Sequence, residues 1–183
     1  MTRPGARERL VEATIASLRD NGVSGTGIAE VLQRSGTARG SIYQHFPDGK
    51  TALVIEAVRT AGEHVSRLLT EHPTAQERFD VLLTWWTLDS TRHRSGDETA
   101  PPGCPVAAAA VDSDPDVRAA AAEVFGRWRD DIAAGLDDRP RAEADRMAGV
   151  AVSALEGAVL QSRARRSLQP LRDVRDVMVP LLS

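Results

Sequence analysis

The chain has 183 residues, of which 42% are hydrophobic and only 4% aromatic, and it carries a net charge of −3. This length corresponds to one or two small domains with enough apolar residues to form a core. The single cysteine excludes an intramolecular disulfide framework. The sequence contains no run of about 18 apolar residues, the length needed to span a membrane. No apolar signal segment follows the N-terminus, so we expect a cytoplasmic protein.

The first half of the chain shows helical periodicity, and Gly and Pro residues separate its segments. The pattern predicts helices over residues 7–21, 26–34, 38–45, 48–69 and 74–92. Gly22 stands where a glycine ends a helix, and Ser35-Gly36 separates the second helix from the third.

The second half begins with a polar loop, predicted over residues 93–103, that contains several prolines and glycines. Asp114-Pro115 is a strong helix-start signal, with an N-cap residue followed by proline at the first helical position. Helices are predicted over residues 104–111, 114–136, 141–167 and 170–182. Aromatic and β-branched residues form no alternating runs, so the sequence predicts an all-α fold of nine helices.

Charge is distributed unevenly along the chain. Residues 1–50 contain seven basic and five acidic residues, a net charge of +2, which leaves −5 for the remainder. A positive first quarter on a negative body suggests an anionic partner for that end. The excess is small, so charge alone supports little.

The second and third predicted helices are short and are joined by a tight turn. A helix of about eight residues is marginal alone, so this pair needs tertiary support. A helix-turn-helix provides it, because the first helix braces the second, which enters the major groove of DNA. We expect Ala29, Val31 and Leu32 to face the core, Gly36 to form the turn, and Ile42 to hold the second helix from behind.

The exposed side of the second helix of this pair is expected to carry hydrogen-bonding groups. Its residues are Ala38, Arg39, Ser41, Gln44 and His45. Arginine pairs with guanine and glutamine with adenine in the major groove. Gly40 lets the backbone approach DNA closely, or else it relieves packing against the preceding helix.

These residues resemble a known family. The segments Thr26-Gly-Ile-Ala-Glu-Val31, Ser35-Gly36, Gly40-Ser-Ile-Tyr-Gln-His-Phe46 and Gly49-Lys50 resemble the N-terminal domain of TetR-type regulators. The stretch from Phe46 to Lys50, with Gly103-Cys104-Pro105-Val106-Ala107 and Glu156-Gly157-Ala158, is similar to the LmrA/YxaF-like branch. The resemblance implies a nine-helix TetR-type architecture, with a helix-turn-helix domain over residues 1–47 and a ligand-binding and dimerisation domain over 48–183.

The resemblance also implies which residues touch DNA. Thr26 would cap the second helix and touch a phosphate, and Tyr43 and Lys50 would each bind another phosphate. Family members often have Ser or Thr where this chain has Ala38, so Thr37 is a candidate cap and the start of the recognition helix stays open by about one residue. Tyr43 could instead only pack, and His45 could be structural. The expected DNA-binding set is Thr26, Thr37, Arg39, Gly40, Ser41, Tyr43, Gln44, His45 and Lys50.

The body of the chain is implied to dimerise and to hold a ligand. The expected dimer interface is a stripe of mostly small residues on one helix, Met147, Ala151, Ala154, Leu155 and Ala158; the alternative is that this helix is the core of one subunit. The expected lining of the ligand pocket is Trp85, Trp86, Cys104, Phe125 and Trp128; the alternative is that these side chains are ordinary core. Neighbouring helix residues diverge by about 100°, so Trp85 and Trp86 cannot both face one interior.

The sequence therefore predicts a homodimeric repressor that binds palindromic double-stranded operator DNA and is released by a small, largely apolar or aromatic effector. We expect no cofactor, no metal, no membrane partner and no catalytic residue. One alternative is a helical ligand-binding or interaction protein without sequence-specific DNA binding. Another is an enzyme, but no catalytic or metal-binding spacing such as H-E-x-x-H is present.

Overall fold

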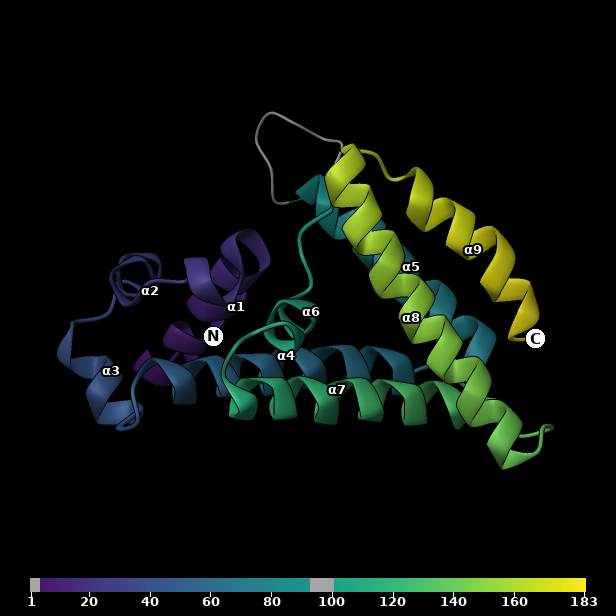
Figure 1. Cartoon of the computed structure of the whole chain (residues 1–183), viewed down its shortest axis with the longest axis horizontal. Coiled ribbons are helices and arrows are strands. Elements are labelled where there is room, and N and C mark those ends of the chain that lie inside the picture. Colours follow the sequence, from purple (N-terminus) through teal and green to yellow (C-terminus); the bar gives the residue numbers. More distant parts are fainter. Residues whose placement is uncertain (1–3, 93–100) are drawn as a thin grey trace. The chain divides into compact units, whose positions relative to one another are not determined.

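The computed structural model describes residues 4–92 and 101–183, except the side chains of residues 88–92 (Figure 1). Within these ranges it contains nine α-helices and no strand, which confirms the all-α prediction. The helices are α1 (Ala6–Gly25), α2 (Ile28–Ser35), α3 (Gly40–His45), α4 (Lys50–Thr70), α5 (Ala75–Arg92), α6 (Pro105–Ala110), α7 (Pro115–Ala133), α8 (Arg141–Arg165) and α9 (Gln169–Leu181). The predicted loop over residues 93–103 lies mostly outside the described residues. In the described part, no helix is both long and apolar enough to cross a bilayer.

The first helix has a break where the sequence predicts its end. Gly22 has φ 68° and ψ −177° inside α1, a backbone conformation that is essentially restricted to glycine. The chain then forms one more short turn before α2. Gly27, immediately before α2, is extended at φ −98° and ψ 143°, so α2 starts at Ile28 rather than at residue 26.

Contacts between residues divide the chain into two compact units. One comprises Met1–Gly62 and Cys104–Val124, and the other comprises Glu63–Gly103 and Phe125–Ser183. The division between the units falls inside α4 and α7. The domain boundary predicted after residue 47 separates two functions rather than two compact units, and it stays a prediction.

In the first unit, α1 packs against α2, α3 and α6. Leu10 and Leu18 of α1 are buried, as are Val31 and Ile42, which were predicted to face the core. Burial of each such side chain contributes about 1.5–3 kcal/mol. Ala29 is exposed, and the prediction that it faces the core is wrong. The residues of α2 that are buried are Val31 and Ser35, four positions apart on one face, and Ala29 points away from it.

In the second unit, α9 lies beside α8 and also packs against α5 (Figure 1). The large buried side chains of this unit include Leu69, Phe79, Leu82, Leu83, Trp86, Trp128, Ile132, Leu155 and Leu171. The start of α5 is tied to the end of α7, because the Ala75 amide donates to the Gly135 carbonyl at 3.0 Å and Arg78 donates to the Asp131 carbonyl.

Candidate nucleic-acid interface

The helices α2 and α3 form the predicted helix-turn-helix. Gly36 joins them in the left-handed conformation, at φ 61° and ψ 33°, which glycine adopts without steric cost. The side chain of Ile42 is 0% exposed and Phe46, directly after α3, is also buried. Both anchor the six-residue helix α3 against the rest of the unit, as predicted for Ile42.

A polar network fixes α2 to α1. Glu30 accepts hydrogen bonds from Ser17 at 3.1 Å and from Asn21 at 3.1 Å. Arg34 forms ion pairs with Asp20 at 2.9 Å and with Glu30 at 2.8 Å. Burial lowers the pKa of Arg34, but the hydrogen bonds and charges of Asp20 and Glu30 outweigh it and raise that pKa. An arginine side chain is always charged in a protein, and its two ion pairs hold α2 in one orientation.

Two arginines of α1 contact the segments around α3. The Nε of Arg9 donates to the carbonyl of Ser35, the last residue of α2, at 3.1 Å. The guanidinium of Arg7 lies over the Phe46 ring, 5.4 Å from its centroid, and pairs with Glu56 at 2.6 Å. Both basic side chains are therefore engaged in positioning the motif.

The turn before α3 contradicts the expected cap. The hydroxyls of Thr37 and Ser35 are hydrogen-bonded to each other at 2.7 Å. No side chain caps α3, and Arg39 occupies the N-cap position with helical dihedral angles. The prediction that Thr37 caps the recognition helix is therefore wrong, and the helix begins at Gly40 instead of residue 38.

The outer face of α3 presents the predicted DNA-binding side chains. Tyr43 is 59% exposed, and Arg39, Gly40 and Gln44 are exposed as well. Ser41 and His45 are half-buried at the sides of this face. An added Cβ at Gly40 would meet nothing within 4 Å, so relief of packing does not explain this glycine.

Thr26 has another role than the predicted one. Its side chain is 2% exposed, its hydroxyl donates to the Gly22 carbonyl at 2.7 Å, and its amide donates to Val23 at 3.2 Å. Gly27 occupies the N-cap position of α2, which has no side-chain cap. The prediction that Thr26 caps α2 is therefore wrong. It fastens the end of α1 and offers almost no surface to a phosphate.

Lys50, the first residue of α4, is half-buried. Its Nζ donates a hydrogen bond to the Val23 carbonyl at 2.9 Å. Sequence reasoning missed this partner, because nothing in the spacing of residues 23 and 50 indicates that they meet.

Comparison with known proteins agrees with this geometry. Residues 10–57 match the family described as "Bacterial regulatory proteins, tetR family". Residues 86–177 match "Transcriptional regulator LmrA/YxaF-like, C-terminal domain". The chain is 39% identical to the uncharacterised HTH-type transcriptional regulator Rv0196 of Mycobacterium tuberculosis, over 96% of this chain and 95% of that protein. The chain belongs to the TetR family of transcriptional regulators.

Solved structures of TetR-family regulators share the fold. A regulator from Chloroflexus aurantiacus superposes with a TM-score of 0.75 at 26% identity, covering 96% of this chain and 92% of that one. The regulator CifR, solved with a 26-base-pair double-strand operator DNA, superposes with a TM-score of 0.72 at 20% identity over the full length of both chains. The members of this family are described as regulators of transcription, which is the class of protein that the sequence predicts.

Part of the predicted dimer interface on α8 is buried within a single chain. Ala151, Leu155 and Ala158 are buried inside a single chain, while Met147 and Ala154 are half-buried. The first three therefore belong to the core of one subunit and the prediction that they form the interface is wrong. Small residues line several sides of α8, so composition alone does not identify the outward one. The apolar side chains that α8 exposes are Val150 and Leu160, and those of α9 are Val177 and Leu181.

The residues predicted to line a ligand pocket are only partly brought together. Trp85 and Trp86 lie edge to face with centroids 5.1 Å apart, and Phe125 and Trp128 do so at 5.6 Å. Trp86 is buried and Trp85 half-buried, so the predicted divergence of the neighbouring tryptophans is confirmed. Cys104 belongs to the other compact unit, where its Sγ accepts a hydrogen bond from the Ala107 amide at 3.4 Å at the start of α6.

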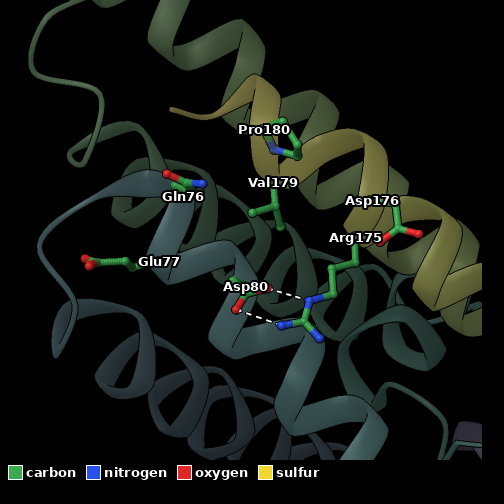
Figure 2. Close-up of a pocket in the computed structure, with 7 residues that line it drawn as sticks. All are labelled: Gln76, Glu77, Asp80, Arg175, Asp176, Val179 and Pro180. Carbon is green, nitrogen blue, oxygen red and sulfur yellow. Dashed lines mark hydrogen bonds and ion pairs between the residues drawn. The ribbon is translucent and has the colours of Figure 1, made fainter.

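A surface pocket of about 560 Å³ lies between α5 and α9, away from those residues (Figure 2). Arg175 of α9 reaches across it to Asp80 of α5, with hydrogen bonds of 2.6 and 3.0 Å. The hydrogen bond to Asp80 raises the pKa of Arg175. The other lining residues are Gln76, Glu77, Asp176, Val179 and Pro180. Five of the seven lining residues are polar or charged, and none of them belongs to the set that the sequence predicts for a ligand pocket.

Proposed function

We propose that the protein is a homodimeric repressor that binds a palindromic operator and is released by a small, largely apolar or aromatic ligand. The exposed outer face of α3 carries this proposal. Its side chains point to solvent from a helix that Ile42 and Phe46 anchor behind, as a recognition helix requires.

Side chains on this face have the chemistry needed to recognise bases and phosphates. Arg39 is suited to guanine O6 and N7, and Gln44 to adenine N6 and N7. The phenol of Tyr43 is suited to a phosphate oxygen, which positions the protein without specifying sequence. Gly40 permits close approach of the backbone, and Ser41, His45 and Thr37 lie beside this face as further contacts.

A dimer through α8 and α9 accounts for the apolar side chains that these helices expose. Val150, Leu160, Val177 and Leu181 are each more than half exposed on two helices that pack side by side. Completing the burial of each one would contribute about 1–2 kcal/mol. A two-fold dimer places two recognition helices about 34 Å apart, one turn of DNA, and matches the two halves of a palindrome. CifR, of the same fold, has been solved on operator DNA, which supports this reading, and the predicted cytoplasmic location belongs to the same proposal.

Release by a ligand requires two conformations of the protein, of which only one fits DNA. A ligand that binds the other conformation more tightly increases its population, and the free-energy change is no larger than the difference between its affinities for the two conformations. The aromatic pairs Trp85–Trp86 and Phe125–Trp128 lie in the second unit. Half-buried Trp85 and Phe125 are the side chains through which we expect a flat ligand to bind.

The test is selection of bound duplexes from a random DNA pool by the purified protein. We expect enrichment of a palindrome with half-sites about one helical turn apart. Arg39→Ala and Gln44→Ala are each expected to relax one position of each half-site, at a cost of about 1–3 kcal/mol. A pool that stays random would instead favour a helical ligand-binding protein without sequence-specific DNA binding.

A further inference from the structure

The segment from the break in α1 at Gly22 to the residue before α2 is short and rich in glycine, and we call it the α1–α2 junction. Residues 22–27 contain three glycines, at positions 22, 25 and 27, and a chain of this kind has many conformations to lose on ordering. Thr26 fastens it locally with its two hydrogen bonds to Gly22 and Val23. These bonds close the turn, but they join neighbours in sequence and do not tie the segment to the rest of the unit.

Lys50 makes such a tie. Its ammonium, 27 positions along the chain, donates to the Val23 carbonyl at 2.9 Å. The same carbonyl accepts the amide of Thr26. Lys50 is the only lysine among 23 basic residues. Hydrogen bonds from a charged donor are stronger than those from a neutral donor.

The other end of α2 is held in the same way, since the Nε of Arg9 donates to the carbonyl of Ser35 at 3.1 Å. A cation therefore binds a backbone carbonyl on each side of an eight-residue helix that is too short to be stable alone. The position of α3 depends on α2, because only the turn around Gly36 separates them. Base recognition requires that the side chains on the outer face of α3 are held within about 0.5 Å of their productive position.

We propose that Lys50 is a positioning residue, which strengthens operator binding by holding the α1–α2 junction in place, in addition to any phosphate contact of its ammonium. This inference rests on the proposed operator binding, and it adds a role to the phosphate contact that the family resemblance implies for Lys50. The ammonium fixes Val23, the ordered junction fixes the start of α2, and α2 sets the aim of Arg39 and Gln44 on DNA.

The first experiment uses the free protein, so that its outcome does not depend on DNA. Amide hydrogen exchange of the junction is compared among wild type, Lys50→Met and Lys50→Arg, with the Thr26 and Val31 amides as reporters. Lys50→Met keeps a long side chain but removes the donor, and we expect these amides to exchange about tenfold faster. Lys50→Arg keeps a charged donor and is expected to restore most of the protection. Because the chain has one lysine, the side-chain ammonium gives a single NMR signal, which we expect to be protected from exchange before DNA is added.

The second experiment measures affinity for the selected operator at several salt concentrations. Lys50→Met is expected to weaken binding about tenfold, equivalent to about 1.4 kcal/mol, at the highest salt concentration at which binding can be measured. Loss of a phosphate contact acts through the slope of log K against log salt, by about 0.9 for one contact, and its effect on affinity fades at high salt. The loss of affinity that persists there therefore measures the positioning role. Arg59→Met is the matched control, because it removes one exposed positive charge from the same helix at a residue that pairs with Glu123.

A rescue variant separates the two roles further. Gly27 is the N-cap of α2, with extended backbone angles and nothing within 4 Å of an added Cβ. Gly27→Ser gives α2 its own cap, because the serine hydroxyl at the N-cap position can accept a hydrogen bond from the amide of Ala29 or Glu30. If Lys50 acts by ordering the junction, this change recovers part of the affinity lost in Lys50→Met and has little effect in wild type. If Gly27→Ser changes the operator affinity by the same factor in wild type and in Lys50→Met, then residues 27 and 50 act independently.

The proposal is overturned if the junction exchanges equally fast in wild type and Lys50→Met, or if the operator affinities of the two proteins converge at high salt. It is also overturned if Gly27→Ser acts equally in both backgrounds. Failure of the wild-type protein to select any DNA would refute operator binding instead, while the exchange result would still show whether Lys50 orders the junction.

Discussion

Ile42 is the side chain on which the placement of α3 depends most directly. It is 0% exposed and is the only residue of this six-residue helix that is buried. Truncation to alanine leaves a cavity where the branched chain contacts the core, and fully buried Ile→Ala changes cost about 2–5 kcal/mol. A value near 3 kcal/mol corresponds to a melting temperature lower by about 6–12 °C for a chain of this size. The protein is expected to remain folded at 20 °C, because domains have about 5–15 kcal/mol of stability.

The assay combines thermal unfolding, followed by circular dichroism, with operator binding well below the melting transition. Loosening of α3 adds an ordering cost to DNA binding, so Ile42→Ala is expected to weaken binding even where the protein is folded. Ile42→Val serves as the graded control, with an expected loss of about 0.5–1.5 kcal/mol. A melting temperature for Ile42→Ala within about 1 °C of wild type would refute the role of this residue as the anchor of α3.

Three further changes test other parts of the protein. Tyr43→Phe removes an exposed hydroxyl and is expected to weaken binding about tenfold on all DNA sequences with no change in melting; gel-shift titrations on specific and random duplexes check both points. Leu160→Glu, or Val177→Glu as a second variant, places a carboxylate in the proposed dimer face and is expected to raise the dimer Kd at least about 100-fold; sedimentation measures this, and an intact dimer in both variants would exclude this face. Gly36→Ala forces a side chain into the left-handed conformation and is expected to cost about 1–2 kcal/mol in chemical unfolding, so an unchanged midpoint would contradict the turn geometry.

Much of the fold was predictable because local signals set it. Period-3.6 apolar patterns, the break at Gly22 and the Asp114-Pro115 start signal locate helices without knowledge of their partners. The buried side of α3 was predictable as well, because Ile42 is a large apolar residue among polar neighbours.

The hydrogen-bond partners of individual polar side chains were not predictable. The hydroxyl of Thr26 was assigned to the start of α2, but it binds Gly22 behind it. Nothing in the sequence indicated that Lys50 binds the carbonyl of Val23, 27 residues earlier in the chain. On α8, small residues lie on more than one side, and only packing shows that Ala151 and Leu155 face inward while Val150 and Leu160 face outward.

The compact unit that contains the helix-turn-helix is discontinuous in sequence, and this affects how such a regulator can be recombined. Residues Cys104–Val124 belong to it, α6 packs on α1, and Thr51 at the start of α4 donates to Asp114 at 3.3 Å. A fragment that ends at Gly62 would lack these partners and expose the surface of α1 that α6 covers. Hybrid regulators made by joining this N-terminal segment to the body of a relative would therefore need to carry residues 104–124 with it. If α3 has the proposed recognition role, exchanging only its outward side chains is expected to change the target DNA without disturbing that surface.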